Sequence, residues 1–194
     1  GESSKIQYEG LSVNSASEYI TRDLNSGRFD FFCGGISIPS RKVESEKLLK
    51  KGSNGIEFFT TQVLYDSKKI KKMLKHYDDI CKKNHVLPRR ILLSFAPVSS
   101  KKNIAFLKWL GVEIPLQTEK RLVNEDSNMT NESLKIATEI LEDILENNEK
   151  NEIKVPVGLN VEHIMSYNFQ HSINMLQEMS KRYRKFCIKT SLYD

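Results

Sequence analysis

The sequence predicts an α/β fold with a parallel sheet, and two features of its pattern favour this class. Short segments that are apolar at nearly every position alternate with longer segments that are apolar on one side only. A strand without polar alternation is usually covered on both faces of its sheet, and strands that alternate with helices usually pair in parallel. The chain has 194 residues. A complete (β/α)8 barrel takes about 250, so a barrel would be present only in part.

Four segments carry the pattern of buried strands, because each is a short run rich in aromatic and β-branched residues. They comprise residues 29–39, 55–65, 90–98 and 153–161. Pro39 ends the first of them, since proline lacks the N–H group that a further ladder bond would need. Their continuous apolarity predicts that both faces of the sheet are covered.

Amphipathic helices are expected before, between and after these strands. Apolar residues recur at spacings of three and four in residues 13–24, 70–81, 134–145 and 169–179. Thr130 or Asn131 is expected to cap the third of these helices. The stretch 111–129 interrupts the alternation of strands and helices and is expected to form a small inserted helix or lid. Residues 147–152 are expected to form a loop that ends the third helix.

Composition and charge exclude several classes of protein. The hydrophobic fraction of 39% and the charged fraction of 28% are those of a globular domain. The net charge of +5 is small and both signs are interleaved, so we expect no nucleic-acid partner. The apolar runs are too short to span a bilayer, so we expect no membrane partner. The start of the sequence lacks an export signal and the three cysteines form no C-x-x-C pair, which predicts a cytoplasmic location.

Polar side chains at strand ends are the candidate ligand contacts. Gln62 interrupts a segment whose neighbours all predict a buried strand, and a buried amide needs hydrogen-bond partners. It either binds a ligand, as residues at the carboxyl ends of barrel strands do, or bonds the backbone. Asn160 stands at the corresponding end of the last strand, where it either joins the same site or forms a turn. Glu162 and His163, taken alone, are more often solvated loop residues than an acid/base pair.

Basic residues cluster before the second strand. Arg41, Lys42, Lys50 and Lys51 lie near the place where an anionic ligand could bind, although most such clusters are solvated helix faces. The four histidines lack partners at zinc-ligand spacing, so we expect no metal site.

Four segments carry a resemblance to a known family: GIEFFTTQVLYD, SFAPVSS, LKWLGVEIP and GLNVEH. In this order and at these spacings they resemble the carboxyl-terminal half of the methylenetetrahydrofolate reductase family, over nearly the whole chain. The resemblance implies a (β/α)8 barrel of which about four βα units are present. It also implies reduction of 5,10-methylenetetrahydrofolate to 5-methyltetrahydrofolate, in one-carbon and methionine metabolism, with NADH or NADPH as hydride donor and FAD as cofactor.

The resemblance implies roles in folate binding for three residues. Gln62 matches the family glutamine that hydrogen-bonds the pterin ring, and Asn160 is expected to face the same ring. Glu2 falls where the family has an acid that faces folate and flavin. The chain departs from the family at Lys101, in place of an aromatic residue that stacks on the folate. It departs again at Val161, in place of an arginine.

The resemblance implies flavin contacts for the basic cluster. Lys51, with Lys50 beside it, matches basic residues near the adenosine and phosphates of the flavin, and Arg41 belongs to the same cluster. The link over residues 39–44 is shorter than the His-Pro-Glu stretch that contacts the flavin in better-known members.

A half-barrel needs further strands to close its sheet. The first four strands of the family, which hold its catalytic glutamate, do not occur in residues 1–194, so no catalytic residue is assigned and this single domain is expected to be inactive alone. A lone half-barrel exposes two strand edges and an apolar lumen, which favours association. We expect either a fragment of a longer enzyme or two copies that complete a barrel as a homo-oligomer. Two alternatives remain open: a non-catalytic, self-assembling α/β module, and a barrel that transfers a methyl group from a pterin.

Overall fold

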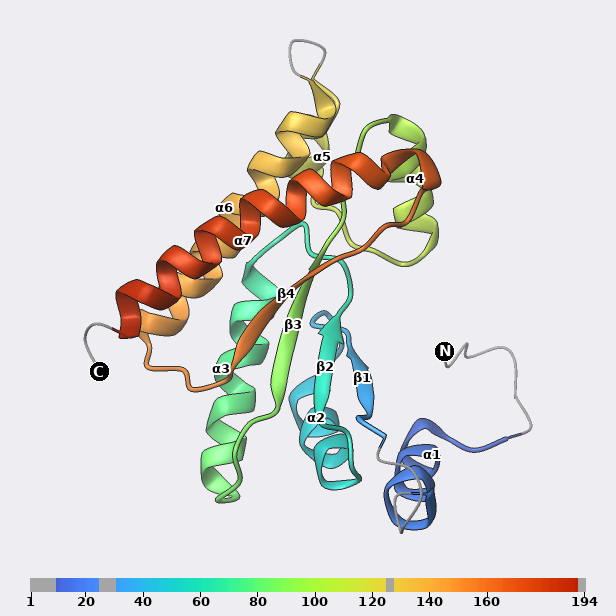
Figure 1. Ribbon diagram of the computed structural model, residues 1–194, viewed down its shortest axis with the longest axis vertical. Coiled ribbons are helices and arrows are strands. Elements are labelled where there is room, and N and C mark those ends of the chain that lie inside the picture. The colour runs from blue at the N-terminus through green and yellow to red at the C-terminus, as the bar shows by residue number, and fades with distance from the viewer. Residues whose placement is uncertain (1–9, 25–30, 125–127, 192–194) are drawn as a thin grey trace.

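The computed structural model describes residues 10–24, 31–124 and 128–191 of the chain. Its four strands lie side by side and pair in parallel, in the order in which they occur in the sequence (Figure 1). They are β1 (Gly34–Ser37), β2 (Phe58–Thr61), β3 (Arg90–Phe95) and β4 (Val157–Val161). Each strand lies within the segment predicted for it and is shorter than that segment. The predicted α/β class with four strands is confirmed.

Helices precede, connect and follow these strands. They are α1 (Val13–Tyr19), which continues as the π-helix η1 (Ile20–Leu24), α2 (Glu44–Ser53), α3 (Lys68–Lys83), α4 (Lys101–Trp109), α5 (Leu116–Leu122), α6 (Met129–Lys150), the 3-10 turn η2 (Ser166–Asn168) and α7 (Phe169–Ser191). The four predicted helices are confirmed, and α5 is the small helix expected within 111–129. Helices α2 and α4 lie outside the predicted ones. In the part of the chain that the structure describes, no helix is both long and apolar enough to cross a membrane.

Helix α6 begins and ends differently from its prediction. Asn128 caps it in place of Thr130 or Asn131, because the Asn128 side chain accepts a hydrogen bond from the backbone N–H three residues later, at 3.1 Å. The helix then continues to Lys150, through most of the loop predicted at 147–152. The helix packs against α3 and α7, and Asn148 near its end is buried, so tertiary contact overrides the polar composition of this end.

The two faces of the sheet differ in burial. On one face, Phe59, Ile91 and Leu93 are fully buried in a core shared with α2, α3, α6 and α7. On the other face, Ile36 is 58% exposed, and Phe32 just before β1 is 71% exposed. The prediction that both faces are covered is therefore wrong for the described chain. Because side chains alternate along a strand, the open face, here called the lumen face, carries Gly34, Ile36, Phe58, Thr60, Arg90, Leu92, Ser94, Gly158 and Asn160.

The connections that follow the strands position the candidate site. The carboxyl ends of parallel strands lie at one edge of the sheet, here called the carboxyl edge. The segment between β3 and α6 extends beyond this edge and contains α4 and α5 (Figure 1). Its Thr118 hydroxyl donates a hydrogen bond to the Tyr65 carbonyl at 3.3 Å. The segment is thereby held over the end of β2.

Candidate functional site

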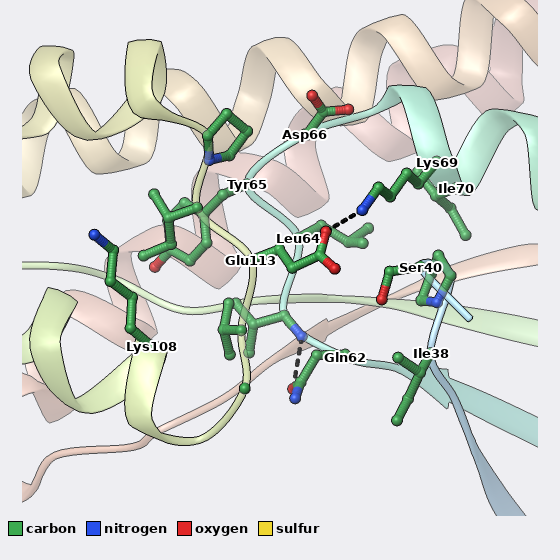
Figure 2. A pocket seen from close by; sticks show the side chains of 16 residues that line it. Ile38, Ser40, Gln62, Leu64, Tyr65, Asp66, Lys69, Ile70, Lys108 and Glu113 are labelled. Carbon is green, nitrogen blue, oxygen red and sulfur yellow. Dashed lines mark hydrogen bonds and ion pairs between the residues drawn. The ribbon is translucent and has the colours of Figure 1, made fainter. Parts of the chain in front are cut away.

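A cavity of about 470 Å³ opens at the carboxyl ends of β1 and β2. Its walls come from the connections that follow these two strands, from the start of α3, and from the connection between α4 and α5 (Figure 2). Apolar side chains such as Ile38, Leu64 and Ile114 line much of it, while Gln62 and Lys69 bring polar groups. Mostly apolar cavities of this size, with a few polar groups, are typical of small-molecule sites.

Gln62 lies in the wall of this cavity, directly after β2. Its N–H group donates to the Ser37 carbonyl at 2.8 Å, so the ladder between β1 and β2 continues through it. Its Oε1 accepts from the Val63 N–H at 3.1 Å, and its Nε2 donates to the Leu110 carbonyl at 3.5 Å. A glutamine amide has two N–H donors and two oxygen lone pairs, so one of each is left for a ligand. Both interpretations of Gln62 fit this geometry, and its role in binding stays a prediction.

A charged pair stands inside the cavity. Lys69 in α3 forms an ion pair with Glu113 (Figure 2), and this bond lowers the pKa of the Glu113 carboxyl. Both side chains are more than half exposed, so the pair contributes little to stability. Lys108 in α4 is bonded to both carboxylate oxygens of Glu119 at 2.7 Å. Because each lysine is paired with a carboxylate, neither of them favours an anionic ligand in the cavity.

Further polar side chains lie on the lumen face at the level of Gln62. Strand β2 pairs with β3 so that Thr60 lies beside Leu92, and β3 pairs with β4 so that Ser94 lies beside Asn160. Beyond this ladder, the Leu64 N–H donates to the Ser94 carbonyl at 2.9 Å, so Gln62 lies close to the level of Ser94 and Asn160. Neighbouring strands are about 4.8 Å apart, which places the backbones at Gln62 and Asn160 about 10 Å from each other. The structure thus brings these two predicted residues to one edge, with Ser94 between them.

Ser94 links Asn160 to Glu162. The Asn160 Nδ2 group donates to the Ser94 hydroxyl at 2.9 Å, and that hydroxyl hydrogen-bonds the Glu162 carboxylate. Glu162 directly follows β4, and its own N–H donates to the Phe95 carbonyl at 2.8 Å, so it stays in phase with Asn160. We call Gln62, Ser94, Asn160 and Glu162 the polar row.

Glu162 is half-buried, which sequence reasoning missed. Burial raises the pKa of its carboxyl, although the bond from Ser94 opposes this effect. Burial also raises the pKa of Tyr65, and the charge of Glu162 adds to this shift. Tyr65 lines the cavity, so Glu162 and the cavity belong to one region. The expectation of a solvated Glu162 is therefore wrong. The spacing of two residues between Asn160 and Glu162 could have indicated that both side chains lie on the same side of the sheet. His163 is exposed, as expected.

The basic residues predicted to contact the flavin lie before and within α2. Arg41 is exposed in the connection after β1, near the carboxyl edge. Lys50 and Lys51 stand in the last turn of α2, and a helix of this length spans about 15 Å. The Lys51 ammonium donates to the Ile36 carbonyl at 2.8 Å. The Arg41 N–H donates to the Ile38 carbonyl, two residues beyond Ile36, and the role of the three basic residues stays a prediction. Glu2 lies outside the described residues.

Metal-binding side chains do not gather in the described structure. Across residues 10–24, 31–124 and 128–191, no group of three or more His, Cys, Asp or Glu side chains is placed to hold a metal ion. The cysteines are free thiols, with Cys81 buried, Cys33 half-buried and Cys187 exposed. The expected absence of a metal site stays a prediction for the whole chain.

Comparison with known proteins places these features in context. The model of a family described as methylenetetrahydrofolate reductase matches residues 31–189. Among solved structures, the chain is similar to an uncharacterized protein from Clostridium thermocellum that binds two copies of 5-methyl-5,6,7,8-tetrahydrofolic acid. The TM-score is 0.73 and the sequence identity is 25%, over 87% of this chain and 59% of that chain. The chain thus spans somewhat more than half of that structure. No curated protein has a matching sequence.

Proposed function

The chain belongs to the methylenetetrahydrofolate reductase family, and on that ground we propose that it forms the carboxyl-terminal half of a (β/α)8 barrel that reduces 5,10-methylenetetrahydrofolate to 5-methyltetrahydrofolate. NADH or NADPH supplies the hydride. One observation carries the proposal: the cavity and the polar row meet at the carboxyl edge, where (β/α)8 enzymes hold their substrates. The similar structure that binds a methylated folate supports the choice of ligand.

The proposed reaction moves one hydride and breaks one carbon–nitrogen bond. The hydride leaves C4 of the reduced nicotinamide and adds to the carbon that bridges N5 and N10 of the folate. The bond from this carbon to N10 breaks, and N10 takes up a proton. Gln62 and Asn160 act by orientation, because they hold the pterin ring while the carbon faces the donor. Such positioning matters, since a displacement of about 1 Å can lower a rate by about 100-fold.

The place of FAD in the proposal rests on the family resemblance alone. Arg41 precedes α2 and Lys51 stands in its last turn, from where the Lys51 ammonium reaches the Ile36 carbonyl in β1. Their contacts with the flavin phosphates stay a prediction. The proposed hydride step has the reduced nicotinamide as its donor.

Completion of the barrel is part of the proposal. Within residues 10–24, 31–124 and 128–191, strands β1 and β4 are the two edges of the sheet, and Ile36 on the lumen face is exposed. Unpaired strand edges and exposed apolar surface favour association. We therefore propose that four further βα units cover the lumen face. These units come from the same polypeptide or from a second copy, and the mass of the assembly in light scattering distinguishes the two sources.

Replacing Gln62 with alanine in the full-length protein tests the proposed function. The variant loses the amide that the ring would contact, while its neighbours in β2 keep their packing. We expect kcat/KM for 5,10-methylenetetrahydrofolate to fall about 10- to 100-fold, because one or two hydrogen bonds to the substrate are lost. The oxidation of NADH or NADPH, followed by absorbance, measures the rate.

Gln177 offers a matched control, because it is a glutamine that is exposed on α7, away from the cavity. Gln177→Ala is expected to keep the wild-type kcat/KM. A Gln62→Ala variant that is as active as Gln177→Ala would show that this cavity does not bind the folate.

Methyl transfer is the second candidate function. The ligand of the similar structure carries a methyl group, so it is a product of the reduction and equally a substrate for a methyl transferase. Reduction predicts oxidation of NADH or NADPH that depends on 5,10-methylenetetrahydrofolate. Methyl transfer predicts demethylation of 5-methyltetrahydrofolate by a thiol or cobalamin acceptor, with no use of nicotinamide. Assays of both reactions with one preparation therefore separate the candidates.

A further inference from the structure

The hydrogen-bond directions within the polar row decide what it offers to a ligand. Asn160 uses an N–H of its amide to donate to Ser94, and the Ser94 hydroxyl then has its own hydrogen to give to Glu162. Ser94 is fully buried, so this hydroxyl is not open to solvent. Among the described residues, the Asn160 Oδ1 atom and most of the lone pairs of the Glu162 carboxylate remain for a ligand. This end of the polar row is therefore rich in acceptors.

The other end of the polar row, at Gln62, offers a donor as well as an acceptor. Gln62 keeps one N–H group of Nε2 that is not bonded to the backbone. It stands two strands away from Asn160, about 10 Å by strand spacing. A flat ring across this span meets a donor at one end and acceptors at the other.

The pyrimidine edge of a pterin matches this order of groups. It presents a carbonyl oxygen at C4, then the N3–H group, then the amino group at C2, which is one acceptor followed by two donors. A carboxylate accepts two parallel N–H bonds from such an edge, and bonds to a charged acceptor are stronger than neutral ones. Asn160 then acts as a positioning residue, because it turns the Ser94 hydrogen towards Glu162.

We infer that Glu162 recognises the N3–H and 2-amino groups of the pterin ring, while the free N–H of Gln62 donates to the carbonyl at C4. This inference rests on the proposed function and adds to it the group that selects the ring. It also assigns to the residue directly after β4 a carboxylate contact that the resemblance placed at Glu2, outside the described residues.

Isothermal calorimetry of the full-length protein with two probes tests the inference. The probes are 5-methyltetrahydrofolate and its 2-desamino-2-methyl analogue, which lacks one of the two donors. The wild type is expected to bind the amino compound about 10- to 100-fold more tightly, the range for a hydrogen bond to a charged group. In Glu162→Gln this preference is expected to shrink to about threefold or less, because the amide is neutral and offers a single acceptor atom.

The substitution should not unfold the protein. Burial raises the pKa of Glu162, so the ionised form costs stability at neutral pH and a neutral amide removes that cost. The melting temperature of Glu162→Gln is therefore expected to be no lower than that of the wild type. Glu146→Gln is the matched control, since Glu146 is exposed on α6, and it should keep the wild-type preference.

The outcomes separate this inference from the proposed function. If Glu162→Gln keeps the full preference for the amino compound, Glu162 does not recognise the ring, and the proposed function stands. If the wild type binds neither probe while it is folded, the proposed function is overturned and this inference falls with it.

Discussion

Replacing Phe59 with alanine is expected to lower the free energy of unfolding by about 3 to 5 kcal/mol. The Phe59 side chain is completely buried in the middle of β2, on the face covered by helices. It also packs against Gly35, where an added Cβ atom would lie only 3.1 Å from the phenylalanine ring. The loss includes both the transfer free energy of the ring and the cavity left between rigid neighbours. Small domains have about 5 to 15 kcal/mol in total, so the variant is expected to be only marginally folded.

Urea denaturation followed by circular dichroism measures this change. Leu87→Ala serves as the control, because Leu87 is 90% exposed and its truncation is expected to change the free energy of unfolding by less than about 0.5 kcal/mol. If Phe59→Ala unfolds at the same urea concentration as Leu87→Ala, the buried core is not on the face assigned to it.

Replacing Ile36 with aspartate is expected to disrupt the completed barrel. In the described chain Ile36 is 58% exposed on the lumen face, so the substitution by itself removes little packing. Once four further βα units cover that face, the same carboxylate would be buried without a partner, which costs several kcal/mol. We expect the full-length variant to melt at a lower temperature than the wild type and to lose its affinity for 5-methyltetrahydrofolate.

The same substitution at Leu87 controls for added charge, because Leu87 precedes β3 at the opposite edge of the sheet. Leu87→Asp should melt and bind folate like the wild type. Equal melting temperatures for Ile36→Asp and Leu87→Asp would mean that the lumen face stays open to water in the active protein.

The fold could be predicted because apolarity marks the strands, but apolarity does not mark where a strand ends. The segment predicted at 55–65 includes Leu64 and Tyr65, which are as buried as β2 yet belong to the connection after it. The same signal gives no information on which partner covers a face, so Ile36 was expected to be covered within the chain. Helix α2 was missed because few of its residues are apolar, and Leu48 is its one fully buried large side chain in the described structure.

The candidate site was predictable where a polar residue stands out against its neighbours in the sequence. Gln62 stands out because it interrupts a segment whose neighbours all predict a buried strand, and Asn160 because it stands at the end of the last strand. Glu162 was missed because it follows the strand beside the polar His163, and because its contact with Ser94 joins it to another strand. Only the register of β3 against β4, which pairs Ser94 with Asn160, brings these groups together.

Calorimetric titration of the full-length protein with 5-methyltetrahydrofolate shows whether the carboxyl edge binds a folate. We expect saturable binding by the wild type, with a dissociation constant raised about 10- to 100-fold in Gln62→Ala and unchanged in Gln177→Ala. Absence of binding by a protein that is folded in circular dichroism and forms a closed assembly in light scattering would overturn the proposed folate site. That result would favour a non-catalytic, self-assembling module.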